Sequence, residues 1–410
     1  MSEAETDGNR SLPYMELANY KFMLSLPEFN NDSTLQNKLM AGIKEGDMAP
    51  FYSTVCADLG WELNEDLLSR MQGMNREKLS QFEKDDNEKG EDENEPRLWL
   101  DKLEYMSSIG DKETALKLAT DKSQDTSLST NCRLDAIFAI FRIAYFHGCD
   151  IKLMKSAIEK ATELIESRTG TGGDWSARNK LKAYEAVCCL GLRNYSRAAD
   201  LLLDSVPTFE SYELLDFSTL IRYTMIACMI ALPRCEFSTK LRKNGALTQA
   251  LHAQPDLKKF YENLYEGQYM EFFVVLAKIE TAMRRDKLLH PHYRHYVREM
   301  KLKAYSQLLQ AYRSLSLKSM AEAFGVTEEY IEKEVSRFAA LGRLQCKIDS
   351  VAGTVVTSGY LNEDAGICGN VVCESAPEAT YERGVMYQVT IKHGDILLNR
   401  LKKLARVMDF

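Results

Sequence analysis

Apolar residues recur every three or four positions along most of the chain, with polar residues between them. The segments LPYMELANYKFMLSL and DLLSRMQGMNREKLSQF, both within residues 12–82, show this spacing. A period near 3.6 residues is that of an amphipathic helix. The chain has 410 residues and only nine prolines, beside many Leu, Ala, Lys and Glu. We therefore predict a mainly α protein of two or three domains that begins with several short helices.

An acidic segment, EKDDNEKGEDENEP, occupies residues 83–96 and has eight acidic residues against two lysines. Such a run of charge stays in water. We interpret it as a solvated linker or the exposed end of a long helix, which would close an N-terminal helical region at residues 1–97. The alternative interpretation is that it attracts a basic partner.

Beyond this segment the helices are predicted to come in pairs. Four places show a helix, a tight polar turn and a helix rich in Ala and Leu, with turns near residues 110, 148, 194 and 267. The separations are 38, 46 and 73 residues, the last close to two periods of about 37. Helical-hairpin repeats of the tetratricopeptide kind have a period of ~34. We predict an α-solenoid of TPR-like repeats, of which residues 98–230 form the regular part. Small residues would let its helices approach closely: Ala115, Ala119, Ala198 and Ala199.

A long helix from about residue 292 to residue 315 is predicted next. One apolar stripe runs along it: Tyr293, Val297, Met300, Ala304, Leu308, Ala311 and Leu315. This helix would connect the solenoid to the segment MAEAFGVTEEYIEKEVSRFAALGRLQCKID, which has the order helix, turn, helix, strand.

That order is the core of a winged helix, predicted at about residues 316–358. The first helix would bury Leu317, Met320, Ala321 and Phe324, with Gly325 at its C-terminal cap. Thr327 would cap the second helix, whose inward stripe is Ile331, Val335, Phe338 and Leu341. A strand follows in which Leu344, Cys346 and Ile348 face inward while Gln345, Lys347 and Asp349 face outward. A turn at residues 352–353 and a returning strand TVVT complete the wing.

The second helix of this module is acidic. Over residues 327–338, Glu328, Glu329, Glu332 and Glu334 oppose only Lys333 and Arg337, a net charge of −2. Non-specific DNA affinity depends on Lys and Arg that displace counterions from phosphates. We therefore predict that this winged helix does not bind nucleic acid and serves protein assembly instead.

The overall composition argues against several classes of protein. Hydrophobic residues make up 45% and charged residues 27%, and the net charge is −8. These values predict a globular protein without general attraction to polyanions. No run of 18 apolar residues occurs, so no membrane span is predicted, and the polar start does not resemble a signal peptide. The ten cysteines lack zinc-type pairs, which favours reduced thiols in the cytoplasm or nucleus.

No complete catalytic, metal or cofactor pattern is found. His290, His292 and His295 would not share one helical face, and we predict exposed histidines at a helix start. Cys368 and Cys373 lack a second pair, and Cys188-Cys189 is predicted to lie in the core. The segment RTGTGGDW lacks the Gly-Lys-Ser/Thr ending of a phosphate loop. We expect no enzyme activity, no metal and no cofactor.

A solenoid that leads into a winged helix resembles the PCI family, whose members occur in the proteasome lid, the COP9 signalosome and initiation factor three. The segments HPHYRHYVREMKLKAYSQLLQAYRSLSLKSMAEAFGV, SRFAALGRLQCKID and TIKHGDILLNRLKKLARVM are similar to lid subunits of the subunit-seven type. So are DMAPFYSTVCADLGW, GDKETAL, GGDWSARNKLKAYEA and FESYELLDF. The resemblance covers residues 12–357 and 387–410. It departs in the acidic region around Gly90 and in an insert that precedes the last helix.

The resemblance implies a non-catalytic scaffold of the lid of the 26S proteasome, in ubiquitin-dependent degradation. It implies a PCI domain at residues 231–358, a polar insert at 359–386 and a C-terminal bundle helix at 387–410. The implied partners are other PCI subunits of the lid, its MPN metalloprotease-type subunits and the proteasome base. Wing strands would add to a neighbour's sheet. The residues expected at this wing edge are Gln345, Lys347, Val355 and Val356.

The spacing of the last helix predicts an assembly element. Leu397, Leu401, Leu404 and Met408 fall at steps of four, three and four, as in a coiled-coil seam. Ile396 and Val407 widen the seam, while the opposite side carries Arg400, Lys402, Lys403 and Arg406. A helix of about 16 residues is marginal alone in water, so we expect a partner to cover its apolar face.

Two alternatives stay open. Residues 284–303 carry seven Lys or Arg against two acids, which is the pattern of an RNA-linked PCI protein, although aromatic platforms for bases are missing. A subunit of the COP9 signalosome or of initiation factor three would share the same fold and differ only in its partners.

Overall fold

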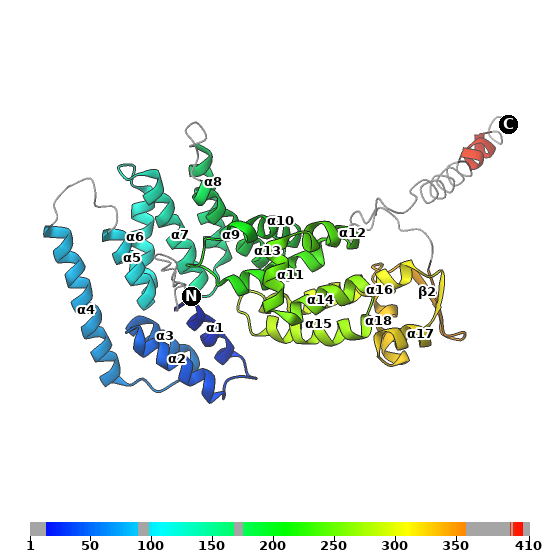
Figure 1. The fold of residues 1–410 in the computed structure, drawn as a ribbon, viewed down its shortest axis with the longest axis horizontal. Helices are drawn as coiled ribbons and strands as arrows, with labels where there is room; N and C mark the ends of the chain where they lie inside the picture. Colours follow the sequence, from blue (N-terminus) through cyan, green and yellow to red (C-terminus); the bar gives the residue numbers. More distant parts are fainter. Residues whose placement is uncertain (1–13, 89–97, 168–174, 358–393, 395–396, 405–410) are drawn as a thin grey trace, which may run out of the picture. The chain divides into compact units, whose positions relative to one another are not determined.

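The computed structural model describes residues 14–88, 98–167, 175–357, 394 and 397–404. These residues form helices joined by short turns and one three-stranded sheet, which confirms the predicted mainly α fold (Figure 1). The N-terminal helices, predicted as short amphipathic segments, are α1 (Tyr14–Ser25), α2 (Ser33–Glu45), α3 (Ala49–Leu59) and α4 (Glu65–Glu88). Because α4 continues to Glu88, the acidic segment begins as the end of a long helix.

Three helical hairpins occur at the predicted places. They are α5 (Leu98–Ile109) with α6 (Lys112–Gln124), α7 (Thr130–Phe146) with α8 (Ile151–Ser167), and α9 (Trp175–Gly191) with α10 (Tyr195–Ser205). Their turns contain Gly110, Gly148 and Arg193, each with positive φ. Glycine is required at position 110 for two reasons: its φ is 80°, and a Cβ there would lie 2.8 Å from Cβ of Phe51. The four predicted small residues are fully buried: Ala115, Ala119, Ala198 and Ala199.

The fourth predicted hairpin is α14 (Pro255–Glu266) with α15 (Tyr269–Arg284), and its turn contains Gly267. Further helical elements lie between the third hairpin and residue 310. They are η1 (Val206–Thr208), α11 (Phe217–Ala231), α12 (Arg234–Glu236), the π-helix η2 (Phe237–Arg242), α13 (Gly245–Ala253), η3 (His290–His292) and α16 (Tyr293–Gln310).

The chain divides into two compact units. Unit 1 comprises Met1–Leu232, Asn244–Asn263 and Glu271–Met300, and unit 2 comprises Pro233–Lys243, Leu264–Met270 and Lys301–Phe410. In unit 1, α7 is buried on all sides over residues 136–146, as its uninterrupted apolar sequence requires.

Unit 2 contains the winged helix. Its elements are β1 (Ser314–Ser316), α17 (Leu317–Phe324), α18 (Glu328–Ala340), β2 (Cys346–Asp349) and β3 (Thr354–Thr357). As predicted, α17 buries its four apolar residues, and Gly325 ends it with a φ of 65°. The ring of Phe324 is central to this core, with its centroid 4.8 Å from Tyr305 and 4.9 Å from Tyr269.

Several details of the wing differ from the prediction. The long helix ends at Gln310, and Leu315 lies in β1, opposite Val355 of β3. The sheet order is β1-β3-β2, so β3 is the middle strand and Val355 and Val356 do not lie at an edge. The edge assignment of these two valines is wrong because the unpredicted strand β1 pairs with the outer side of β3.

Two helix assignments are also corrected. Leu341, predicted to face inward, is 61% exposed, because α18 ends at Ala340 and the chain reverses through Gly342 with a φ of 68°. Thr327 occupies the N-cap position of α18, but its side chain makes no capping hydrogen bond. The other inward residues of α18, Ile331, Val335 and Phe338, are buried as predicted.

Candidate protein-interaction surfaces

The first candidate surface is the outer strand of the winged-helix sheet. In the described part of the chain, β2 pairs with β3 on one side only, because it is the last strand in the order β1-β3-β2. Lys347 on β2 is exposed, and Gln345, just before the strand, is partly exposed. A strand with an unoccupied side is a template for pairing with another chain, and a lysine on it limits indiscriminate pairing.

The second candidate surface is the C-terminal helical segment at residues 397–404. Its leucines are exposed: Leu397 by 59%, Leu398 by 54%, Leu401 by 63% and Leu404 by 59%. Met408, the last residue of the predicted seam, lies outside the described residues. A row of exposed leucines makes this segment a candidate interaction surface, because isolated exposed apolar residues are common but a row of them is not.

The basic stretch at residues 284–303 is used within the fold. In unit 1, Arg284 forms an ion pair with Glu28, Arg285 lies 5.2 Å from the Phe29 ring, and Arg294 lies 5.7 Å from the Tyr293 ring. Buried Lys287 donates a hydrogen bond of 2.8 Å to the carbonyl oxygen of Tyr145.

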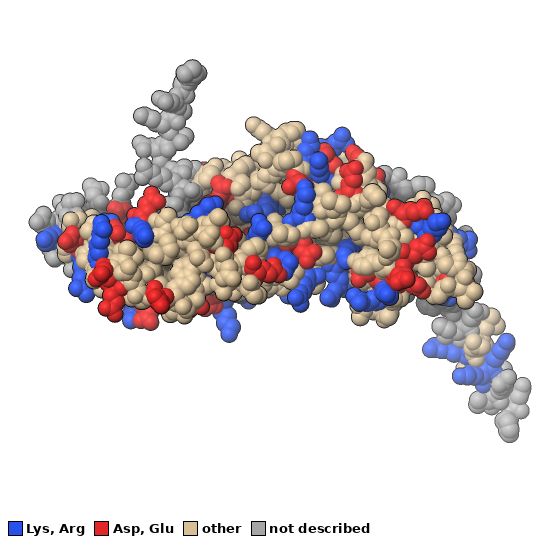
Figure 2. All heavy atoms as spheres, turned by 90° about the horizontal axis from the view of Figure 1, so that it is seen from below, with Lys and Arg blue, Asp and Glu red and all other residues tan. Residues whose placement is uncertain are grey.

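In unit 2, Lys301 forms an ion pair with Glu334 at 3.6 Å, and Lys303 lies 4.8 Å from the Phe237 ring. The face in Figure 2 shows acidic and basic side chains interspersed. Among the described residues, several basic side chains of this stretch are thus engaged by contacts within the chain, which does not favour the pattern of an RNA-linked PCI protein.

One histidine of the cluster, His292, is structural where it was predicted to be exposed, whereas His290 and His295 are partly exposed. His292 is 8% exposed. Nε of Arg193 donates to its Nδ1 at 2.7 Å, so Nε2 carries the proton and donates to the carbonyl oxygen of Gly191 at 2.9 Å. Burial lowers the pKa of His292, which keeps the ring neutral. Within the described residues, no group of three or more His, Cys, Asp or Glu is arranged to hold a metal ion.

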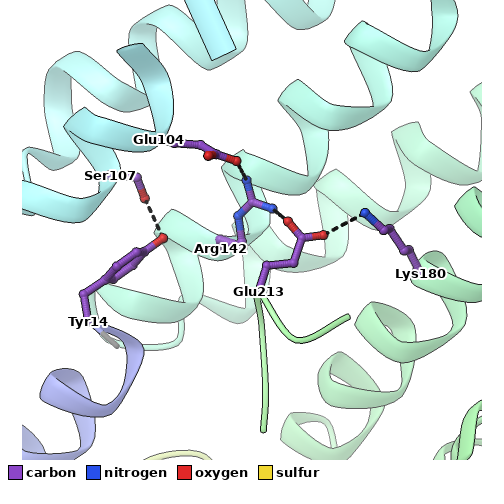
Figure 3. A network of polar contacts seen from close by, with 6 residues as sticks. All are labelled: Tyr14, Glu104, Ser107, Arg142, Lys180 and Glu213. Carbon is purple, nitrogen blue, oxygen red and sulfur yellow. Dashed lines mark hydrogen bonds and ion pairs between the residues drawn. The ribbon is translucent and has the colours of Figure 1, made fainter. Parts of the chain in front are cut away.

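A buried ion-pair network in unit 1 was not predicted. Arg142 of α7, 5% exposed, contacts Glu213, which precedes α11, and lies 3.7 Å from Glu104 of α5 (Figure 3). Lys180 of α9 contacts the other oxygen of Glu213 at 3.1 Å. Tyr14 and Ser107 lie beside it, 3.5 Å apart. The signal in the sequence was a single arginine inside the apolar run IFAIFRIAYF.

The pKa values of the two carboxyl groups in this network shift in opposite directions. Burial alone would raise the pKa of Glu213, but the charges of Arg142 and Lys180 outweigh it and lower that pKa. Burial raises the pKa of Glu104, and the more distant Arg142 only partly offsets it. Glu213 is therefore the principal counter-ion of Arg142. The network connects α5, α7, α9 and the segment before α11, so we assign it to stability.

Other predicted positions are placed as follows. Cys188 is buried and Cys189 is half-buried within α9. Cys368, Cys373 and the RTGTGG loop lie outside the described residues. Among the helices that are described, none combines the length and apolar content needed to cross a bilayer.

Comparisons with known proteins identify the family. Residues 64–240 match the family described as 26S proteasome subunit RPN7, residues 276–358 match the PCI domain, and residues 386–408 match the RPN7/PSMD6 C-terminal helix. The chain is 36% identical over 402 residues to the 26S proteasome non-ATPase regulatory subunit 6 homolog of Arabidopsis thaliana, with 97% of each chain covered. The chain belongs to the 26S proteasome non-ATPase regulatory subunit 6 (RPN7) family.

Two further members of the RPN7 family are similar over a comparable extent. The chain is 36% identical over 411 residues to subunit 6 of Caenorhabditis elegans, covering 97% of this chain and 93% of the relative. It is 30% identical over 426 residues to regulatory subunit RPN7 of Saccharomyces cerevisiae, covering 96% and 92%. The predicted resemblance is confirmed. The alternative of a signalosome or initiation-factor subunit finds no support in these relatives.

Proposed function

We propose that this chain is a non-catalytic structural subunit of the 26S proteasome regulatory-particle lid, which scaffolds lid assembly for ubiquitin-dependent protein degradation. The observation that carries the proposal is similarity over the whole chain, at 36% identity with 97% of both sequences covered. A protein that shared only the PCI domain would match over part of its length. The proposed partners are the other PCI subunits, the MPN-type subunits and the proteasome base, and the proposed location is the cytoplasm and nucleus.

The C-terminal helix is the proposed assembly element. Three of its four seam residues lie in the described segment and are exposed by 59–63%: Leu397, Leu401 and Leu404. Complete burial of a leucine stabilises by about 1.5–3 kcal/mol, so a few such residues decide whether a subunit joins a helical bundle. The outer strand β2, with Lys347 exposed beside Gln345, is the proposed site of sheet extension by a neighbour.

The assembly role predicts the effect of changing two seam leucines to glutamate. The variant Leu401→Glu/Leu404→Glu should keep the fold, because both side chains are exposed, but should lose incorporation into the lid. A matched control is Leu63→Glu/Leu192→Glu, which changes two leucines that are 41% and 50% exposed elsewhere in the chain. The measurements are circular dichroism melting of each purified variant and native-gel assembly in cells.

Affinity purification of the tagged wild type and of both tagged variants, followed by mass spectrometry, tests which complex the chain joins. Lid subunits should copurify with the wild type and the control but not with the seam variant. Recovery of initiation factors or signalosome subunits in place of lid subunits would refute the proposed complex. Normal assembly of the seam variant, or its failure to fold, would refute the role of the helix. Turnover of a ubiquitin or peptide substrate by the pure chain would contradict the non-catalytic assignment.

A further inference from the structure

A groove lies in unit 2 at the junction of α17 and α18. Its volume is about 880 Å³, within the range of ligand-binding sites, and its lining includes Met270, Ala321, Gly325 and Val326. Met270 is 55% exposed although it packs closely on Gly325, where an added Cβ would lie 2.8 Å from Cγ of Met270. The apolar part of its lining, the groove floor, therefore surrounds the left-handed turn after α17.

The rim of this groove is acidic. Glu322, Glu328 and Glu329 line it together with the cation Lys318, and all four side chains are exposed. Lys333 lies 3.8 Å from Glu329, so three carboxylates stand against two cations at this rim. Carboxylates on the rim of an apolar groove favour an occupant that presents apolar side chains flanked by Lys or Arg. An amphipathic helix with basic flanks meets this requirement.

The chain itself contains a segment with this chemistry. Residues 397–404 have the sequence LLNRLKKL and are helical, with four leucines and three cations, Arg400, Lys402 and Lys403. The leucines are each more than half exposed, so apolar surface remains to be covered when no other subunit is bound. The helix bears a charge of +3, opposite in sign to the groove rim.

The connection between the two is long enough. About 40 residues, 358–396, separate β3 from this helix. At ~3.3 Å per residue such a length can extend to about 130 Å. A module the size of the winged helix is only about 25–30 Å across. Chain length therefore permits the helix to reach the groove of the same molecule.

We propose that, in the free chain, the basic C-terminal helix docks into the acidic, Met270-floored groove of its own winged helix. Docking covers the leucines that are otherwise exposed, and the same surface must be released before another subunit can use it. The acidic start of α18, which is unsuited to DNA, thereby serves as an electrostatic receptor for a basic helix. This inference concerns the free chain and does not rest on the proposed function.

The test uses the purified full-length chain. A carbodiimide, which joins amines directly to carboxylates, should link Lys402 or Lys403 to Glu328 or Glu329, as identified by mass spectrometry. Amide hydrogen exchange in residues 397–404 should become about threefold to thirtyfold faster in the groove variant Glu322→Lys/Glu329→Lys, in which two attractive pairs become repulsive. Addition of Lys402→Glu/Lys403→Glu to that variant should restore slow exchange, because the charges are then exchanged across the contact.

A matched control is Glu77→Lys/Glu163→Lys, which makes the same charge change at exposed positions on α4 and α8 and should leave exchange in residues 397–404 unaltered. If the groove variant fails to fold, as judged by circular dichroism, Met270→Lys places one positive charge on the groove floor and should give the same acceleration.

Two results would overturn the inference. One is an unchanged rate of amide hydrogen exchange in residues 397–404 after the groove charges are reversed, or a rate that stays fast when the helix charges are reversed as well. The other is found by mixing isotope-labelled with unlabelled chains, where cross-links that join labelled to unlabelled peptides would place the helix in the groove of a second copy. Lid assembly can be normal whether or not the helix docks in the free chain, so either of these results would overturn the docking inference without affecting the proposed function.

Discussion

The buried ion pair between Arg142 and Glu213 supports a quantitative stability prediction. The Arg142 side chain is 6% exposed and that of Glu213 is 24% exposed. Burial would lower the pKa of Arg142, but the neighbouring oxygens of Tyr184, Glu213 and Glu104 outweigh it and raise the pKa, so the guanidinium stays charged. The change Glu213→Gln therefore leaves a buried cation without its principal counter-ion. Breaking such a pair costs about 3–5 kcal/mol.

The remaining contacts place the expected cost at the lower end of this range. Glu104 still lies 3.7 Å from Arg142 after the change, but its own side chain is 43% exposed and water screens the attraction. We expect Glu213→Gln to destabilise unit 1 by about 3 kcal/mol. The matched control is Glu104→Gln, which removes the exposed partner of the same guanidinium and should cost less than about 1 kcal/mol.

The assay must report on unit 1 alone, because a chain with two compact units need not unfold in one step. Native-state hydrogen exchange of the α7 amides meets this need. The expected loss corresponds to about 100-fold faster exchange in Glu213→Gln and less than about tenfold in Glu104→Gln. Equal acceleration in the two variants, or a change below tenfold in Glu213→Gln, would refute the argument that burial of the pair sets its strength.

Three further predictions follow from particular residues. Because the folded-state pKa of Glu213 is lowered, its contribution to stability is present above the ordinary Glu pKa of about 4.3 and is lost as pH falls through the folded value. The melting temperature of Glu213→Gln, measured as pH is lowered through this range, should therefore fall less than that of the wild type. Gly325→Ala should destabilise unit 2 by about 1–2 kcal/mol in thermal melts, since φ is 65°, whereas Gly73→Ala, within α4 with no atom in contact, should stabilise by up to about 1 kcal/mol. Sub-micromolar binding of duplex DNA with a steep salt dependence, measured by titration, is not expected for this chain, because α18 carries a net charge of −2.

The sequence by itself determined the elements that depend on local periodicity and backbone chemistry. The four hairpin turns lie between segments with apolar residues at helical spacing, and three of them contain a glycine that permits positive φ, namely Gly110, Gly148 or Gly267. The remaining turn holds Arg193 at positive φ, which its residue type did not indicate. The inward faces of α17 and most of α18 were also predictable, since residues three and four apart share one side of a helix. The acidic surface of α18 could be predicted from a count of its charged residues alone.

The tertiary structure decided which strand lies at the edge of the sheet. The segment around Leu315 continues a helical apolar pattern, yet it forms β1 because its backbone pairs with β3 from residue 354 onward. That pairing moves Val355 to the middle of the sheet and leaves β2 as an outer strand. A strand of three residues carries too little periodicity to compete with a long helical stripe, so only contact with a distant segment reveals it.

The tertiary structure also decided which polar residues are buried. Arg142 and Glu213 lie 71 positions apart, and His292 contacts Gly191 from 101 positions away. No local pattern specifies which helices meet, so these partners could not be paired from spacing. Leu341 is exposed although it continues the apolar stripe of α18, because the helix stops one residue before it. The spacing of apolar residues did not reveal where the helix ends. Local periodicity specifies the face of an element, whereas burial depends on what packs against that face and where the element ends.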